Sequence, residues 1–430
     1  MKKIVALFLA IALCVSIAAC GSSSQSSGTA ADTTGGTTAA AGNKKPSDFK
    51  KFTIGIAEGL ANDETVIRRA YLEKYIAPKY NVKFIFSELL KDASAELSFI
   101  ENCADSGADA IIDFKGANPT QMSQVCKDAG MKYIVNYPKE GSAQSLFKEN
   151  PDNFLGGFSA NQPDTGRMFG DYLKKNASKD GKEGFLISSA IASSGNEQHI
   201  QITEAALNAL KEIYGLNYKK DVKQLAVVDA PTEATNDKGI NIFVYPGSNT
   251  KDSWLPGISA VLQTGKYGFL ISAGQSYTSS SVVVDEVERS FNKDIKVISV
   301  ASLGKSLTTA FNTKDKFGNA SINLGTVKSV SMVSAGLFAM AYNGLTGYDK
   351  NMKQSDGTSS SFSFKMWGVE SADQLSIMNN WDSVDTGKWI ADYDLIDSLL
   401  GIYHADLNAD TFQKNVDSYT YESTLKKLGK

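Results

Sequence analysis

The stretch AIIDFKGANPTQMSQVCKDAGMKYIVN, residues 110–136, carries the pattern that decides the fold. It begins with a short apolar run at 110–114, continues with helical spacing at 119–129, and ends with a second apolar run at 133–136. Two buried strands joined by one helix form a parallel β-α-β unit, because parallel strands need a long crossover between them. The stretch therefore predicts a parallel sheet covered by helices.

The same alternation extends outward from this unit. Before it, the sequence predicts strands at 52–56 and 82–86 and helices at 64–79 and 93–106. The alternation starts again after residue 160, and two successive α/β series predict two lobes. The strands expected in the second series are 184–188, 240–245, 267–272, 295–300 and 320–324, and the helices are 163–176, 197–213, 253–263, 278–291, 304–312 and 329–343, with further helices near 371–379 and 392–401.

A secretory signal precedes the α/β part. Lys2 and Lys3 lead into an apolar segment at 4–15, which is shorter than the roughly 20 residues that span a bilayer. The run Ile17-Ala18-Ala19-Cys20 resembles the lipobox of bacterial lipoproteins. That resemblance implies cleavage before Cys20, lipid (palmitate) on Cys20, and a place on the extracytoplasmic face of the cell membrane. The alternative is an uncleaved transmembrane anchor. Residues 21–45 are small and polar and predict a flexible tether.

Composition excludes several classes of function. The hydrophobic share of 42% is that of a globular chain with a substantial core. The formal net charge is −3, and no block of Lys and Arg offers a footprint for nucleic acid. No Cys/His cluster has zinc spacing, so we expect no metal and no cofactor. Cys103 and Cys126 either form a disulfide, which an extracytoplasmic location permits, or remain two buried thiols.

Several stretches share an order and spacing with one known family. They are SGADAII at 106–112, KDAGMKYIV at 127–135, SANQ at 159–162 with the helix that follows it, and IKVISV at 295–300. Together they resemble the type 1 periplasmic binding proteins of ABC importers, in the ribose- and galactose-binding branch. The resemblance spans about residues 52–345 and implies an α/β fold of two Rossmann-like lobes with parallel sheets, joined by a three-segment hinge.

The resemblance also suggests domain boundaries. We expect a signal peptide at 1–19, a tether at 20–50, a first lobe at 51–158 plus about 326–346, and a second lobe at 159–325 plus about 347–430, which includes a C-terminal extension.

Ligands of open α/β sheets bind beyond the carboxyl ends of the strands. We therefore expect ligand contacts from Asn62 (with Glu58 beside it), Lys115 and Tyr137 in the first lobe. Asn161 and Gln162 at the crossover and Gln275 in the second lobe offer amide donors and acceptors. The alternatives are helix capping in the loop of Asn62 and Asp63, a solvated Lys115 or its pairing with Asp113, and rim packing for Tyr137.

The sequence departs from the sugar-binding pattern at three places. The region that carries an Arg in the family reads Gln198-His199-Ile200-Gln201, the late strand ends in Ala273-Gly274, and the usual Phe-Asp pair is Val300-Ala301. The expected Arg and carboxylate contacts to sugar hydroxyls are thus mostly missing, and the sequence does not name the ligand.

The resemblance implies a non-enzymatic, monomeric substrate-binding protein. It would capture a small polar, sugar-like ligand and present it to an ABC permease, whose ATPase is a separate subunit. One alternative is a sensory binding protein for a chemoreceptor or sensor kinase. Another is a surface serine hydrolase, because Ser276 lies in a Gly-Gln-Ser stretch between a strand and a helix and His404 follows later.

Overall fold

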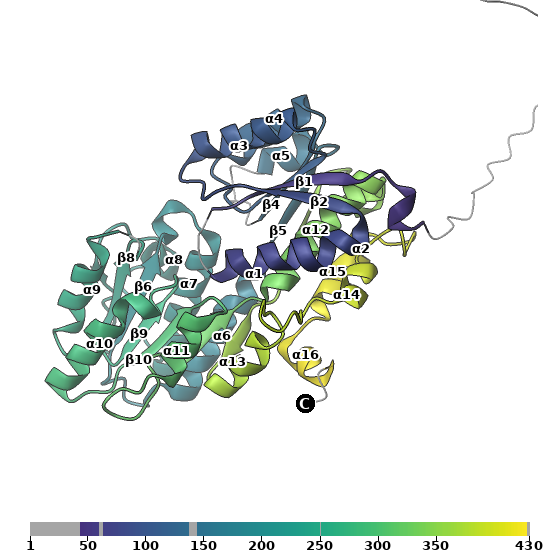
Figure 1. Ribbon diagram of the computed structural model, residues 1–430. Coiled ribbons are helices and arrows are strands. Elements are labelled where there is room, and N and C mark those ends of the chain that lie inside the picture. The colour runs from purple at the N-terminus through teal and green to yellow at the C-terminus, as the bar shows by residue number, and fades with distance from the viewer. Residues whose placement is uncertain (1–43, 60–62, 137–143, 250, 428–430) are drawn as a thin grey trace, which may run out of the picture. The chain divides into compact units, whose positions relative to one another are not determined.

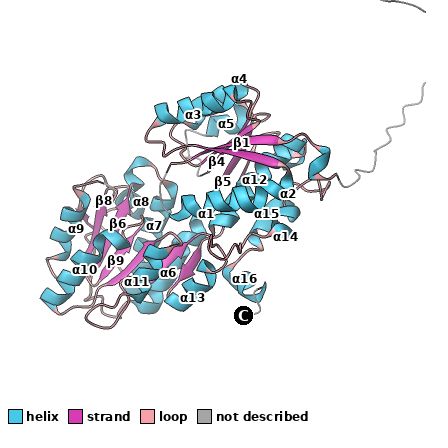
Figure 2. Ribbon diagram, in the orientation of Figure 1, coloured by secondary structure: helices cyan, strands magenta, loops and turns pink. Residues whose placement is uncertain are grey.

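The protein is described by a computed structural model that covers residues 44–59, 63–136, 144–249 and 251–427. Its strands form two separate sheets, drawn in magenta in Figure 2. The predicted α/β class with two lobes and parallel sheets is therefore confirmed. Among the described residues, no helix combines the length and apolarity that a membrane span requires.

The first sheet has six strands in the order β12-β5-β4-β3-β1-β2, and all neighbours run parallel. Ile54 in its middle pairs with Phe84 on one side and Ala110 on the other. The apolar runs of the sequence are buried here because helices cover both faces. The strands are β1 (Phe52–Ala57), β2 (Val82–Phe86), β3 (Ala110–Asp113), β4 (Lys132–Asn136), β5 (Phe154–Ala160) and β12 (Ser360–Phe364).

Among the described residues, one group of helices covers one face of this sheet and a second group covers the other (Figure 1). The first group is α3 (Ala93–Asp105), α4 (Pro119–Asp128) and α5 (Gln144–Glu149). The second group is α1 (Asp63–Tyr71), α2 (Ala77–Tyr80), α12 (Val330–Thr346), α14 (Tyr393–Ser398) and α15 (Ala409–Asp417). A π-helical segment, η2 (Leu72–Ile76), joins α1 to α2, so the helix expected at 64–79 is continuous but not uniform.

The second sheet has seven strands in the order β13-β11-β10-β9-β6-β8-β7, with antiparallel strands at both edges. The strands are β6 (Phe185–Ala190), β7 (Thr232–Glu233), β8 (Ile242–Pro246), β9 (Phe269–Ser272), β10 (Lys296–Val300), β11 (Leu324–Val327) and β13 (Trp367–Val369). One face carries α6 (Gln162–Asn176), α7 (Glu197–Tyr214) and α8 (Val222–Ala226), and the other carries α9 (Trp254–Leu262), α10 (Tyr277–Phe291), α11 (Lys305–Asn312) and α13 (Ala372–Asn379). The remaining elements are α16 (Tyr421–Lys427) and the short turns η1 (Pro46–Asp48), η3 (Ala192–Ser194) and η4 (Asp349–Met352).

Three segments connect the strands of the two sheets. The chain passes from β5 to α6, returns from β11 to α12, and passes again from β12 to β13. The backbone N–H of Asn161 donates to the carbonyl of Phe364 at 2.7 Å, so the first and third crossings lie side by side. These three crossings agree with the three-segment connection that the resemblance implies, and a fourth crossing, from α13 to α14, returns the C-terminal extension to the first core.

The C-terminal extension differs from the expectation. We assigned residues from about 347 onward to the second lobe, but β12 pairs with β5 in the first sheet, and α14 and α15 pack in the first core. The apolar residues of α12 explain the difference: every residue from Val330 to Gly344 is buried, and a helix that is apolar all round needs cover on all sides. The extension supplies that cover.

Two smaller findings concern local structure: one corrects a strand boundary, and the other decides between the two alternatives for Cys103 and Cys126. The strand expected at 320–324 is β11 at Leu324–Val327, because the preceding residues form the connection from α11 instead. Cys103 and Cys126 are buried free thiols rather than a disulfide. Burial raises the pKa of Cys103 to about 11, which keeps the thiol protonated and unreactive at neutral pH.

Candidate functional site

The structure describes four of the predicted ligand contacts. Asn62 and Tyr137 lie outside the described residues, as does the lipidation candidate Cys20. Lys115, Asn161, Gln162 and Gln275 are all partly buried and all lie just beyond the carboxyl end of a strand. Their side chains nevertheless have different hydrogen-bond partners.

Lys115 follows β3 but does not pair with Asp113 through its ammonium group. Its Nζ donates to the backbone carbonyl of Lys91 at 3.0 Å, and only its backbone N–H donates to Asp113, at 2.8 Å. Gly59 approaches Lys115 so closely that a Cβ on Gly59 would lie 3.1 Å from the Lys115 Cα. The loops after β1 and β3 therefore pack directly on each other.

The crossover amides have mostly structural partners. Asn161 caps α6, since its Oδ1 accepts a hydrogen bond from the Asp164 N–H at 3.1 Å. This helix cap, which was not predicted from the sequence, accounts for the Asn161 oxygen. The neighbouring Gln162 differs, because its Oε1 is buried and has no hydrogen-bond partner among the described residues.

Gln275 belongs to a chain of hydrogen bonds that continues through Ser302 to Glu64. Its Nε2 donates to the Ser302 hydroxyl at 2.6 Å, and its backbone carbonyl accepts from Asn249 at 2.5 Å. Ser302 in turn hydrogen-bonds the Glu64 carboxylate, and Lys328 lies 3.1 Å from the same carboxylate. Glu64 belongs to α1 on the first sheet, whereas Ser302 and Lys328 follow β10 and β11 of the second sheet. The contacts therefore join both lobes.

A second contact between the lobes lies one residue earlier. Asp63 Oδ2 accepts a hydrogen bond from the Lys305 backbone N–H at 3.1 Å, at the amino end of α11. A carboxylate is favourable there because the helix dipole places partial positive charge at that end. The start of α1 is therefore held against the second lobe by two successive acidic residues.

Glu58 and Arg68 extend this cluster into the first lobe. They form a buried ion pair, and the Arg68 guanidinium lies 3.7 Å from the centre of the Phe114 ring. We call the set Glu58, Glu64, Arg68, Gln275, Ser302 and Lys328 the junction network. Its members come from the ends of β1, β9, β10 and β11 and from α1, which is where open α/β sheets bind ligands.

Burial and charge act differently on the two glutamates. Burial raises the pKa of Glu58, and the attraction of Arg68 only partly offsets it. Burial also opposes the charge of Glu64, but Lys328, Arg68 and the Ser302 hydroxyl outweigh it and lower the pKa of Glu64. Glu64 is therefore an ionised hydrogen-bond acceptor that nearby cations stabilise, because a buried charge costs much free energy unless it is paired.

The network contains polar atoms that lack partners. Glu58 Oε1, Glu64 Oε1 and Arg68 Nε are all buried, and none has a hydrogen-bond partner among the described residues. An unsatisfied buried polar group costs about 1–3 kcal/mol, so such a group points to a missing partner. Two acceptors and one donor at one place suit hydroxyl groups, which both donate and accept.

His199 lies at the start of α7 in the second lobe. His199 Nδ1 accepts from the Ile191 N–H at 3.3 Å, and burial lowers the pKa of His199 to about 4. The imidazole is therefore uncharged at neutral pH. His199 occupies the region where the resemblance leads us to expect an Arg, so the missing charge is not replaced there.

Some residues of the junction network can be predicted from the sequence, and others cannot. Gln275 and Glu58 were recognised from their places after strands. Lys328 also follows a strand, but the strand was expected at 320–324, so its end was misplaced. Glu64 and Arg68 lie on a helix that carries many charges, and no local pattern in the sequence separates the buried ones from the exposed ones.

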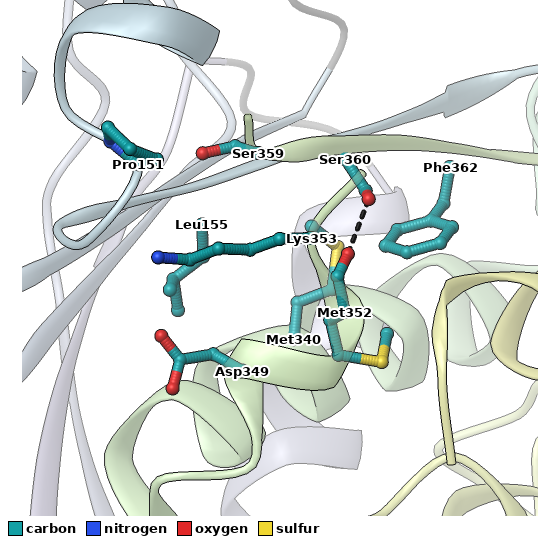
Figure 3. Close-up of a pocket in the computed structure, with 9 residues that line it drawn as sticks. All are labelled: Pro151, Leu155, Met340, Asp349, Met352, Lys353, Ser359, Ser360 and Phe362. Carbon is teal, nitrogen blue, oxygen red and sulfur yellow. Dashed lines mark hydrogen bonds between the residues drawn. The ribbon is translucent and has the colours of Figure 1, made fainter. Parts of the chain in front are cut away.

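Two pockets are lined mainly by residues outside this network. Figure 3 shows one of about 10 Å³ at the amino ends of β5 and β12, with room for about one water molecule. A second, open hollow of about 610 Å³ lies beside α1, with Glu58 on its wall and the exposed side chains Val66, Leu89 and Val384 around it. No residue of the second sheet lines this hollow among the described residues, so the junction network is the better candidate site.

The hydrolase alternative depends on a Ser276–His404 pair. Ser276 begins α10 and is buried, and its hydroxyl has no hydrogen-bond partner among the described residues. Among the described residues, Ser276 thus has no hydrogen-bonded base of the kind that activates a nucleophilic serine.

Comparison with known proteins supports the fold. The sequence matches no protein-family model. It also matches no curated protein. Solved structures do match, and the three described next are solute-binding proteins of ABC transporters.

The first, from Bacillus halodurans with bound myo-inositol, has a TM-score of 0.52 at 14% identity and covers 76% of this chain and 96% of that chain. The second, from Burkholderia graminis in complex with D-arabinose, has a TM-score of 0.51 at 14% identity and covers 76% and 97% of the two chains. The third, from Actinobacillus succinogenes with bound D-allose, has a TM-score of 0.52 at 12% identity and covers 76% and 99%. The chain therefore has the two-lobed fold of type 1 periplasmic binding proteins.

Proposed function

We propose that this chain is a lipid-anchored, extracytoplasmic substrate-binding protein that captures a small polar, sugar-like ligand for an ABC importer. The junction network is the observation that carries the proposal. It joins both lobes at the carboxyl ends of their strands and leaves buried carboxylate and guanidinium atoms without partners. Sugar hydroxyls would supply those partners. The solved structures of the same fold that were crystallised with myo-inositol, D-arabinose and D-allose support this ligand class.

No covalent step is part of the proposed function. A ligand that contacts both lobes favours the arrangement in which the lobes are closed, because only that arrangement makes all the contacts. The closed form would then be recognised by a permease, and a separate ATPase subunit would supply the energy for transport.

We further propose that the protein acts as a monomer anchored through lipid on Cys20. The first lobe is assigned to 51–158 and 326–346 and the second to 159–325, with the segment after 347 divided between them.

A thermal-shift screen of the full chain against sugars and polyols tests the proposal. A ligand at about 100 times its Kd should raise the Tm by about 5 °C, because it binds only the native state. Glu58→Gln and Glu64→Gln should weaken binding of that ligand about 10- to 100-fold, since each removes a charged acceptor.

The matched control is Glu88→Gln, an exposed residue that lines the open hollow and is not a member of the network. It should leave binding unchanged. Circular dichroism of each variant separates lost binding from lost folding. The proposal fails if no sugar or polyol shifts the Tm, or if folded Glu58→Gln and Glu64→Gln proteins bind as well as the parent does.

A further inference from the structure

Three acidic side chains meet on the second lobe, away from the junction network. Glu288 lies in the last turn of α10, Asp294 in the turn before β10, and Asp315 in the connection from α11 to β11. One carboxylate oxygen of each lies within 4.8 Å of those of the other two. Among the described residues, none of the three forms an ion pair with a lysine or arginine. The negative charges are therefore brought together without a protein cation.

Backbone N–H groups and one side-chain amide hold these carboxylates in place through one oxygen of each. Glu288 Oε1 accepts from the Ile295 N–H at 2.9 Å, and Asp294 Oδ1 accepts from the side-chain Nδ2 of Asn319 at 3.1 Å. Asp315 Oδ1 accepts from the N–H groups of Phe317 and Asn319, at 2.7 and 2.9 Å. The turn that makes these two contacts passes through Gly318, whose φ of +83° suits glycine. The carboxylates are thus oriented before any ligand binds.

Glu288 gives an independent sign that a partner is missing. The residue is only 1% exposed, and its second oxygen, Oε2, is buried without a hydrogen-bond partner among the described residues. Burial, together with repulsion from Asp315 and Asp294, raises the pKa of Glu288 to about 7. A cation at this place would coordinate the unpaired Oε2 of Glu288 and would also relieve the repulsion between the three carboxylates.

We propose that Glu288, Asp294 and Asp315 bind one calcium ion. Calcium takes oxygen ligands at 2.3–2.6 Å, so two ligands of one ion lie at most about 5 Å apart, and these carboxylates, within 4.8 Å of one another, meet that bound. Magnesium gives up its bound water reluctantly and is rarely held by protein ligands alone, and zinc favours nitrogen and sulfur ligands, so calcium suits an all-carboxylate cluster better than either. The ion would tie the end of α10 and the start of β10 to the α11–β11 connection. This proposal does not rest on the proposed function.

Calcium titration of the full chain, freed of metal with EDTA, tests the site. Calcium chloride should raise the Tm, by about 5 °C at 100 times the Kd, and magnesium chloride at equal ionic strength should raise it less. Isothermal titration calorimetry should show one calcium per chain. Glu288→Gln and Asp315→Asn should abolish the calcium-dependent rise.

The variants also separate a metal site from a structural hydrogen bond. Without calcium, Glu288→Gln should melt at the same temperature as the parent or higher, because it keeps the acceptor for Ile295 and removes a repelling charge. The control Glu286→Gln, an exposed residue of the same helix, should respond to calcium as the parent does. The proposal is overturned if calcium causes no rise beyond that of magnesium, or if Glu288→Gln and Asp315→Asn keep the full rise.

Discussion

At the carboxyl end of β3, two buried acidic side chains share a hydrogen bond. Glu96 and Asp113 are both fully buried, and the Asp113 carboxylate also accepts from the Tyr133 hydroxyl at 2.5 Å. Burial, followed by the hydrogen bond to Asp113 and the repulsion between the two groups, raises the pKa of Glu96 to about 9. Glu96 is therefore protonated at neutral pH and supports the loop that carries Lys115.

Replacing Glu96 by Gln should flatten the pH dependence of stability. Between the ordinary pKa of 4.5 and the folded value of about 9, the folded chain binds one proton more than the unfolded chain. The free energy of unfolding should thus fall as the pH rises through this window, by at most about 1.4 kcal/mol per pH unit. Urea denaturation at several pH values measures the slope. Glu101→Gln, an exposed residue on the same helix, should keep the parent slope, and an unchanged slope in Glu96→Gln would contradict the assignment.

At the scale of elements, the C-terminal extension is fastened to the second crossing by one buried carboxylate. Asp382 accepts from the Ser329 hydroxyl at 2.7 Å and from the Ser331 N–H at 3.0 Å, at the amino end of α12. It also accepts from the Ile390 N–H at 3.1 Å and from the Ser331 hydroxyl. One side chain thus connects the loop between α13 and α14 to the segment that returns to the first sheet.

Asp382→Ala should destabilise the protein by about 3 kcal/mol, because it leaves several buried donors without an acceptor. Chemical denaturation of the full chain gives this value directly. Asp385→Ala, in the same loop but exposed, should change the free energy of unfolding by less than about 0.5 kcal/mol. Equal effects of the two substitutions would show that Asp382 does not fasten the extension.

At the scale of the whole molecule, the proposed function places a two-lobed receptor beside a membrane permease. The folded part spans the residues from β1 to α16, and the junction network joins its two sheets. The proposed lipid on Cys20 lies outside the described residues and is tested separately. Two acyl chains are needed for stable membrane binding, which a lipid-modified cysteine would provide.

Cys20→Ala should abolish incorporation of a palmitate analogue in bacterial cells that carry the lipoprotein machinery. It should also move the protein from the membrane fraction to the soluble fraction or leave it as the uncleaved precursor. Cys14→Ala, in the apolar part of the signal, should label as the parent does. Labelling that persists in Cys20→Ala would refute the lipid attachment.

The sequence by itself determined the order of strands and helices for most of the chain. Local hydrophobic periodicity reports which residues face a core, and buried parallel strands stand out as short apolar runs. Local pattern also predicted that Gln275 and Glu58 follow strand ends. It missed β12 and β13, because their alternating Ser, Phe and Trp residues lie in a short segment with no helix between them.

Only the tertiary structure decided which charges meet. Glu64, Ser302 and Lys328 lie far apart in the chain and are joined because α1 of the first sheet reaches the strand ends of the second. Glu288, Asp294 and Asp315 likewise come from helix α10, the turn before β10 and the α11–β11 connection. A sequence pattern records the burial of each segment, but contacts between segments depend on how whole sheets are placed, and that placement is fixed by long-range packing.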